Sequence, residues 1–290
     1  TAPGKIDNEY KIWPVEARVT ATDNVFMYAA GTNSSFEISN AASEPHVTQL
    51  LDLLASMGAE ISGQGSNKVY IKGLKELPLA ANFTPNPDHI DIAGYIVAAA
   101  VTDGEITIKG ANIPSIVDGM SNIFEKFNIK IDRQGEDLVV SRKGDLEINW
   151  KESGLPLAAD GLVKITPSPW PGFPVDAFPL LAPLACKTKG QVLLKNWMYE
   201  NALDFTNILN DLGANIYKSD AERVIVFGPV KFKGGVAVSP GIIRACKAIF
   251  LAALADPVKT TIHGTNILNR AYPGIFETYK SLGADIKIVS

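Results

Sequence analysis

The chain has 290 residues, of which 46% are hydrophobic and 20% are charged, a composition that excludes a disordered tail and a fibrous repeat. The length allows two domains, or one large one, with a core that needs no disulfides. Lys and Arg number 27 and Asp and Glu 31, which gives a net charge of -4. Without a dense basic cluster, binding to nucleic acid or to an acidic membrane is not expected.

The two cysteines, Cys186 and Cys246, lie far apart and form no CxxC motif. A disulfide framework and a zinc ribbon are therefore both disfavoured, and a reducing compartment fits best. The sequence contains no signal peptide, and its apolar runs, such as 245–254, are too short or interrupted to span a membrane. We expect a cytoplasmic protein that uses neither a cofactor nor a metal.

One pattern recurs four times along the chain: an amphipathic helix, a glycine or asparagine, and a short strand. The first copy has apolar residues at three- and four-residue steps, which predicts a helix that buries one face. Gly58, Asn128, Gly213 and Gly283 stand where the left-handed conformation that ends a helix is expected. The four copies cover residues 50–61, 120–131, 205–216 and 275–286.

An alanine-rich helix followed by a strand precedes each copy. These segments are residues 25–39, 95–109, 180–195 and 248–264. Small side chains let such helices pack closely on one another or on a sheet. The chain is therefore predicted to be an α/β (α+β) protein of four units, each with the order helix, strand, helix, strand, strand.

The segment from Leu74 to Asp88 is rich in Pro, Asn and Ala and loses the periodicity, which is typical of a linker. We place a domain boundary near Asn86, so that residues 1–86 hold one unit and the linker, and residues 87–290 hold three units. A single solenoid of four units is the alternative. The longer step from Asn128 to Gly213 and the proline-rich insert at 167–174 argue against regular stacking.

Seven motifs then appear in order. They are Asn40–His46, Met57–Leu74 with its Gly63-Gln64-Gly65, Pro87–Asp91 with Gly94-Tyr95, Pro171–Asp176, Tyr199–Asn201, Ile243–Ala245 and Asn269–Tyr272. Together they resemble the enolpyruvyl transferase family over nearly all residues after Glu16. The Asn40–Pro45 and Tyr199–Asn201 segments look like the branch that uses a UDP-sugar, and the shikimate branch is the relative most easily confused with it.

The resemblance implies an inside-out α/β barrel, with six units in two domains of three. The chain shows four units, so it is similar to the last unit of one domain plus the whole of the other. A start at Thr1 without methionine agrees with an absent N-terminal third. The family's catalytic cysteine loop would lie in that third, and Cys186 and Cys246 are expected to be packing thiols.

The resemblance to the UDP-sugar branch implies that an enolpyruvyl group moves from phosphoenolpyruvate to the 3-hydroxyl of UDP-N-acetylglucosamine, the first committed step of peptidoglycan synthesis. The resemblance implies that Asp176 is the base and a sugar ligand, although an ordinary helix N-cap is the alternative. Arg244 and Arg270 would bind phosphoenolpyruvate, since guanidinium groups bind phosphate and carboxylate through paired hydrogen bonds. Their alternative is a surface ion pair.

Other positions match the family more weakly. Glu16, Ala17, Arg18 and Val19 align with a stretch around the UDP moiety, and Arg18 is equally well a solvated loop residue. Met198 stands at a substrate-contacting position, or is plain packing. Three acidic residues are assigned supporting roles, and the first two could be caps of helices or turns; they are Glu44, Asp88 and Glu200.

The chain departs from the family at several positions. Ile242 replaces an Asp before Arg244, Asn269 replaces an Asp before Arg270, and Ala202 replaces an Arg; His89 and His46 replace an Arg and a Glu. These changes remove charges that would hold the arginines, which suggests a divergent lineage or altered substrate handling.

The leading hypothesis is a UDP-sugar enolpyruvyl transferase that is inactive without the N-terminal third. The alternatives are a 3-phosphoshikimate-type transferase and a noncatalytic homologue that binds a UDP-sugar or a partner. Because an unpaired fourth unit would expose apolar surface, we also expect association with an N-terminal partner polypeptide or with a second copy.

Overall fold

The computed structural model describes residues 9–74, 76, 78 and 80–289. Contacts divide the chain into two compact units, called the first unit and the second unit below. Each of the four smaller units predicted from the sequence, with the order helix, strand, helix, strand, strand, is called a repeat from here on. The first unit runs to Pro87 and includes the short segment Pro169–Gly172, and the second contains Asp88–Ser168 and the residues from Phe173 onward. The boundary expected near Asn86 lies beside this division, and its status as a boundary between domains stays a prediction. Of the expected linker, Lys75, Leu77 and Leu79 lie outside the described residues, as does the Thr1 start.

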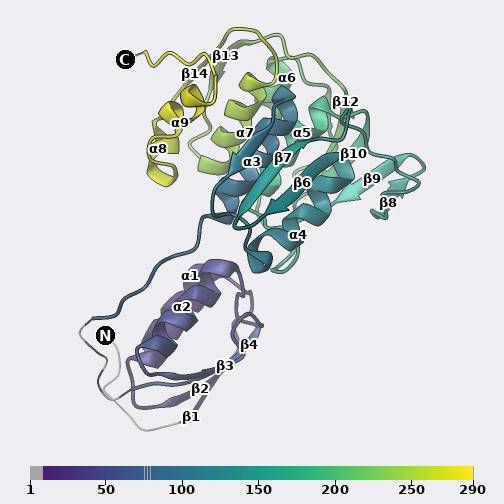
Figure 1. Cartoon of the computed structure of the whole chain (residues 1–290). Coiled ribbons are helices and arrows are strands. Elements are labelled where there is room, and N and C mark those ends of the chain that lie inside the picture. The colour runs from purple at the N-terminus through teal and green to yellow at the C-terminus, as the bar shows by residue number, and fades with distance from the viewer. Residues whose placement is uncertain (1–8, 75, 77, 79, 290) are drawn as a thin grey trace. The chain divides into compact units, whose positions relative to one another are not determined.

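The first unit places two helices on one face of a four-stranded sheet (Figure 1). The strand order is β1-β2-β4-β3, with β1 parallel to β2 and the other pairs antiparallel. Alternate residues of β2 and β4, among them Ile38 and Val69, are buried against the helices, as the two-residue period of a strand requires. The elements are β1 (Glu9–Ile12), α1 (Val19–Ala30), β2 (Ser35–Ser39), α2 (Pro45–Ser56), β3 (Glu60–Ser62) and β4 (Lys68–Lys72).

The second unit continues the same order of elements. Its first part contains α3 (His89–Thr102), β5 (Ile106–Ile108), α4 (Pro114–Phe124), β6 (Ile129–Gln134) and β7 (Asp137–Arg142). The next part contains β8 (Leu157–Ala159), β9 (Leu162–Ile165), a 3-10 helix (Phe178–Leu180), α5 (Leu181–Lys187), β10 (Gly190–Lys195), α6 (Thr206–Asp211), β11 (Ile216–Lys218) and β12 (Arg223–Gly228). The last part contains β13 (Gly235–Val238), α7 (Ile243–Leu254), β14 (Thr260–His263), α8 (Leu268–Ala271) and α9 (Ile275–Ser281).

The sheets of the second unit repeat the pairing seen in the first. Their strand orders are β5-β7-β6, β11-β12-β10-β9-β8 and β13-β14. In each of the first three repeats, the first strand pairs antiparallel with the last strand; these first strands are β2, β5 and β10. Three further strands, β1, β9 and β13, each precede a repeat and pair parallel with the first strand of that repeat. The sequence analysis did not predict these preceding strands.

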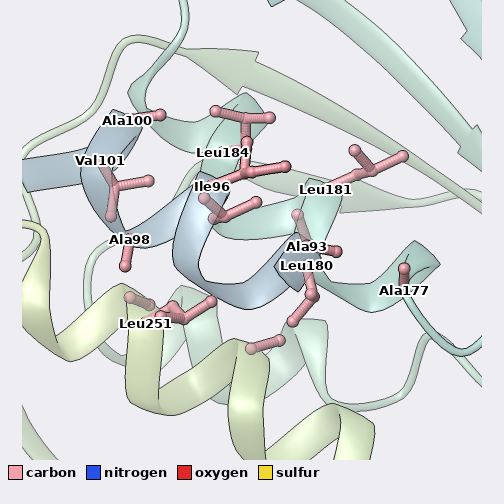
Figure 2. Packing of buried hydrophobic residues seen from close by; sticks show 14 of the residues in the cluster. Ala93, Ile96, Ala98, Ala100, Val101, Ala177, Leu180, Leu181, Leu184 and Leu251 are labelled. Atoms are coloured by element: carbon pink, nitrogen blue, oxygen red, sulfur yellow. The ribbon is translucent and has the colours of Figure 1, made fainter. Parts of the chain in front are cut away.

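The core of the second unit forms where α3, α5 and α7 pack on one another. Figure 2 shows that the contact is made by small and branched side chains, including Ala93, Ile96, Leu184 and Leu251, all of them fully buried. Alanines let the helix backbones approach closely, and the larger aliphatic side chains fill the remaining space. The helices thus lie inside and the sheets outside, as expected for an inside-out α/β barrel.

The predicted helix ends are confirmed. Gly58, Gly213 and Gly283 have φ of 103°, 105° and 103°, and Asn128 has φ of 61°, all in the left-handed region. Three complete repeats with the order helix, strand, helix, strand, strand are also confirmed. The prediction of a strand in the fourth repeat, around Ala284 to Ile286, is wrong. Its counterparts β3, β6 and β11 each pair with the strand that follows, whereas no strand follows within the described part of the fourth repeat.

Within the described ranges, the structure contains no helix with the length and apolar character needed to cross a membrane.

Candidate functional site

Arg244 and Asp176 form an ion pair that remains open to solvent. Arg244 is in the first turn of α7, and its Nη1 donates to Oδ1 of Asp176 at 2.7 Å. The guanidinium carbon also lies 4.3 Å from the centre of the Tyr199 ring, a cation–π contact. The Arg244 side chain is 28% exposed and that of Asp176 is 50% exposed, so an incoming anion can reach the guanidinium group.

Local packing explains where Asp176 lies. Phe173 is buried, and its ring meets that of Phe124 edge-on at 5.6 Å. The Ala177 N–H donates to the Pro174 carbonyl at 3.1 Å and closes the turn that carries Asp176. The alternative of a helix N-cap is wrong, because the cap position of the following 3-10 helix is Ala177 and no side chain caps it. The Asp176 carboxylate faces Arg244 instead.

The segment after β10 holds the Tyr199 ring. Asn196 is buried, and its Oδ1 accepts from the backbone N–H groups of Met198 at 3.1 Å and Tyr199 at 3.3 Å. The indole Nε1 of Trp197 donates to the Pro167 carbonyl at 3.0 Å. Met198 itself is half-buried, and Glu200 is exposed. These contacts hold the segment that carries Tyr199, whose ring lies against the guanidinium group.

A second cation, Lys247, lies one turn further along α7 and is fully buried. Its Nζ donates to Oδ1 of Asp91 at 2.7 Å and lies 3.6 Å from the centre of the Tyr272 ring. Burial lowers the pKa of Lys247, while the negative charges of Asp91 and Asp88 oppose that shift. Lys247 was not predicted from the sequence to be part of a site. The signal was a lone charge inside the apolar run of α7.

Tyr272 lies among three carboxylates. Burial raises the pKa of its hydroxyl, and the negative charges of Asp88, Asp91 and Asp176 raise it further. The ring therefore stays neutral at any ordinary pH. Lys247 follows Arg244 by one turn of α7 and contacts the Tyr272 ring, so the Arg244 pair and the Lys247 pair lie close together in the second unit.

Arg270 lies in α8, two residues before Tyr272, and its side chain is exposed. Considering only residues that the structure describes, Arg270 makes no ion pair. It is therefore available to an anionic ligand. No three His, Cys, Asp or Glu side chains of the described residues are grouped so that they could hold a metal ion.

The structure also shows the surroundings of the other predicted residues. Glu16 to Val19 belong to the first unit, at the start of α1, where Arg18 Nε donates to Glu16 Oε2 at 2.5 Å and both side chains are exposed. Asp88 caps α3: its Oδ1 accepts from the Ile90 N–H at 2.7 Å, so the capping alternative is confirmed there. Glu44 precedes α2 without capping it, so the capping alternative is wrong for that residue.

Both cysteines are buried in the second unit, Cys186 in α5 and Cys246 in α7. Burial raises the pKa of the Cys186 thiol to about 12. Burial also raises the pKa of Cys246, while a hydrogen bond with Ser239 opposes the shift. The thiolate is the nucleophilic form, and a catalytic acid must contact its substrate, so neither buried thiol fits either role, in agreement with packing thiols.

Native protein should therefore resist thiol reagents. With a pKa about 12, on the order of one Cys186 side chain in ten thousand is ionised at pH 8, and the fraction rises about tenfold per pH unit. We expect labelling by iodoacetamide at least about 100-fold slower than in urea-unfolded protein. Mass spectrometry of labelled peptides measures both rates. Fast labelling of Cys186 in the native protein would contradict the burial.

Comparisons with known proteins agree on one family. The model of the EPSP synthase (3-phosphoshikimate 1-carboxyvinyltransferase) family matches residues 15–279. UDP-N-acetylglucosamine 1-carboxyvinyltransferase of Treponema denticola is 35% identical over 273 residues, which cover 94% of this chain and 62% of that protein. The enzyme of the same name from Borreliella burgdorferi is 34% identical over 274 residues, again 94% of this chain and 62% of the relative. The chain thus spans about 62% of the length of these relatives.

Solved structures support the fold. The enolpyruvyl transferase NikO from Streptomyces tendae superposes with a TM-score of 0.82 at 22% identity, over 98% of this chain and 66% of that one. EPSP synthase from Acinetobacter baumannii gives a TM-score of 0.72 at 16% identity, over 99% of this chain and 64% of that one. At these identities the likeness extends to the arrangement of helices and sheets.

Proposed function

Because the chain belongs to the EPSP synthase family of enolpyruvyl transferases, we propose that it carries the phosphoenolpyruvate-binding part of an enzyme that acts on UDP-N-acetylglucosamine. The proposed reaction moves the enolpyruvyl group to the 3-hydroxyl of the sugar and releases phosphate, at the start of peptidoglycan synthesis. The observation that carries the proposal is the solvent-accessible pair of Arg244 and Asp176. It places a fixed cation and a carboxylate side by side in a chain of this family.

The roles follow from the chemistry. Asp176 takes the proton of the sugar 3-hydroxyl as the oxygen bonds to C2 of phosphoenolpyruvate, and a general acid protonates C3. Loss of a proton from C3 and cleavage of the C2–O bond then release phosphate. Arg244 and Arg270 hold the phosphate and carboxylate of phosphoenolpyruvate. We assign the general acid to no described residue, since both cysteines are buried away from any ligand.

The UDP-sugar is favoured over shikimate 3-phosphate as the acceptor, because curated relatives that are 34% and 35% identical carry the name of the UDP-sugar enzyme. Glu16 to Val19 and Met198 are the residues that we propose for the UDP-sugar, with Glu44, Asp88 and Glu200 in support. Two buried free thiols agree with a reducing compartment, and we place the reaction in the cytoplasm.

Calorimetry and a phosphate-release assay test the proposal. We expect phosphoenolpyruvate and UDP-N-acetylglucosamine to bind, and shikimate 3-phosphate not to bind. We also expect no phosphate release by the chain alone, and release once the part of the Treponema denticola relative that it does not match is added. Robust turnover by the chain alone would contradict the dependence on that part. Binding of shikimate 3-phosphate instead of the UDP-sugar would transfer the proposal to the other branch.

A noncatalytic binding role is the second candidate, and the free edge of β14 favours it. In each of the first three repeats the first strand pairs antiparallel with the last. In the fourth repeat the first strand is β14, and in the described residues it pairs only with β13. Val236 and Val238 of β13 are 68% and 63% exposed. An open strand edge beside apolar side chains is a site where another chain can add a strand.

We propose that a strand of a partner polypeptide, or of a second copy, pairs with β14. Sedimentation velocity of the chain, alone and with the unmatched part of the relative, should show a dimer or a mixed complex. Val238→Lys should weaken that complex, and Tyr70→Lys is the matched control, since Tyr70 is exposed on β4, a strand paired on both edges. A monodisperse monomer in both samples would contradict the proposed pairing. Tight UDP-sugar binding without turnover in the mixture would favour the noncatalytic role.

A further inference from the structure

Lys247 occupies a position that only an unusual neighbour permits. Its side chain is 0% exposed and runs from α7 against α3 at Gly94. A Cβ atom at Gly94 would lie 2.3 Å from Cε and 2.5 Å from Nζ of Lys247. Gly94 therefore leaves the space that the lysine side chain occupies against α3. Glycine weakens a helix interior, so its presence here has a cost in helix stability.

The ammonium group joins three elements. Its Nζ bonds to Asp91 in the first turn of α3 at 2.7 Å, and it stands 3.6 Å from the centre of the Tyr272 ring, directly after α8. Lys247 itself follows Arg244 by one turn of α7, so the two cations share a helix face. Tyr272 follows Arg270 by two residues. One buried group thus links the helix that carries Arg244 to the segment that carries Arg270.

Stability alone does not explain such a group. A buried ion pair costs about as much in lost hydration as it returns, and apolar residues of similar size often replace one without loss. The contact with Tyr272 does fix a geometry, because a cation over a ring face restrains the ring in direction and distance. Two guanidinium groups hold one small anion only if their separation is held to within a fraction of an ångström.

We propose that Lys247 is a positioning residue: by holding Tyr272 and Asp91, it sets where α8 presents Arg270 relative to Arg244. This inference rests on the proposed function, in which the two arginines hold one phosphoenolpyruvate. Lys247 touches no ligand itself, since its side chain is fully buried.

Two variants disturb this contact in different ways. The double variant Lys247→Met/Asp91→Asn removes both charges and leaves no unpaired ion in the interior. Gly94→Ala keeps every charged group and displaces the ammonium group, because the added Cβ takes its space. The matched control is Lys187→Met/Asp256→Asn, since that lysine is 14% exposed and bonds to its aspartate at 2.9 Å, also in the second unit.

Two readouts follow each variant. The first is the amide hydrogen exchange of residues 268–272 without ligand, and the second is the dissociation constant for phosphoenolpyruvate by calorimetry. We expect about tenfold faster exchange at 268–272 and at least about tenfold weaker binding in both Lys247-site variants. In the Lys187 control, exchange at 268–272 and binding should stay within about twofold of the unchanged chain. Urea unfolding should rank the two double variants alike.

The outcomes separate the two ideas. Unchanged exchange at 268–272 in the Lys247-site variants would overturn the positioning role whatever binds. Faster exchange with unchanged affinity would overturn the link from that segment to the ligand. Equal losses in the Lys187 control would reduce Lys247 to general stabilisation and also overturn the inference. If the unchanged chain does not bind phosphoenolpyruvate, the proposed function fails, and local exchange specific to the Lys247-site variants still supports the placement of α8.

Discussion

Replacing Arg244 with alanine should weaken phosphoenolpyruvate binding by about 30- to 100-fold, because the ligand loses a charge-assisted hydrogen-bonding partner worth about 2 to 3 kcal/mol. The free energy of unfolding should change by less than about 1 kcal/mol. The Asp176 carboxylate is 50% exposed, so water takes over its hydrogen bond when the guanidinium group is absent. Calorimetry with phosphoenolpyruvate and urea unfolding measure the two quantities.

Two further variants decide what the Arg244 result means. Arg244→Lys keeps the charge and should restore only part of the affinity, since an ammonium group cannot both donate in pairs and lie flat on the Tyr199 ring. Asp176→Asn should leave phosphoenolpyruvate binding unchanged or slightly tighter, because it removes a competing carboxylate. In an assembled, active enzyme the same change should slow transfer by about 100- to 10,000-fold. A loss of binding in Asp176→Asn equal to that in Arg244→Ala would mean that the pair serves structure rather than a ligand.

Local patterns predicted most of the fold. A helix that ends at Gly58 or Gly213 is encoded within a dozen residues, by apolar spacing and one residue that accepts positive φ. The strand expected after Gly283 failed for the opposite reason. Strand formation depends on a hydrogen-bonding partner, and the partners of β3, β6 and β11 come from the next segment of the chain. Strands β1, β9 and β13 were missed because their parallel partners lie beyond an intervening helix.

The candidate site was harder to predict than the fold. Arg244 and Asp176 are separated by 68 residues, and only the family resemblance suggested that they meet. The partner of Lys247 is 156 residues away, and no spacing rule connects them. The sequence nevertheless held two signals, a single charge within an apolar helix and a glycine within an alanine-rich one. A buried charge needs a partner, so a lone lysine in such a run is a reason to look for a carboxylate.

The charges lost at family positions have a structural consequence that the sequence left open. Ile242 is 43% exposed and supplies no carboxylate to Arg244, yet the guanidinium group is held by Asp176 and the Tyr199 ring. Near α8, where Asn269 stands in place of an acidic residue, the buried Lys247 and Asp91 provide the adjacent fixed charges. Arg244 thus keeps a defined position although Ile242 supplies no charge beside it.

Two glycines at the same place in different repeats of the fold should be hard to replace. A Cβ at Gly73, after β4, would lie 2.1 Å from the Ala29 carbonyl oxygen at the end of α1. A Cβ at Gly228, the last residue of β12, would lie 2.1 Å from the carbonyl oxygen of Thr188, just after α5. Backbone carbonyls of a helix end cannot rotate away, so the helix and sheet must separate.

We therefore expect Gly73→Ala and Gly228→Ala each to cost more than about 3 kcal/mol of unfolding free energy. Gly104→Ala is the matched control, since its nearest neighbour is the Thr102 hydroxyl oxygen at 3.4 Å, and it should be nearly neutral. Each unit has its own hydrophobic cluster, so Gly73→Ala should raise hydrogen exchange in α1 and α2 and spare α5, whereas Gly228→Ala should do the reverse. If Gly228→Ala were no more destabilising than Gly104→Ala, the close approach of strand and helix would not be a requirement of the repeat.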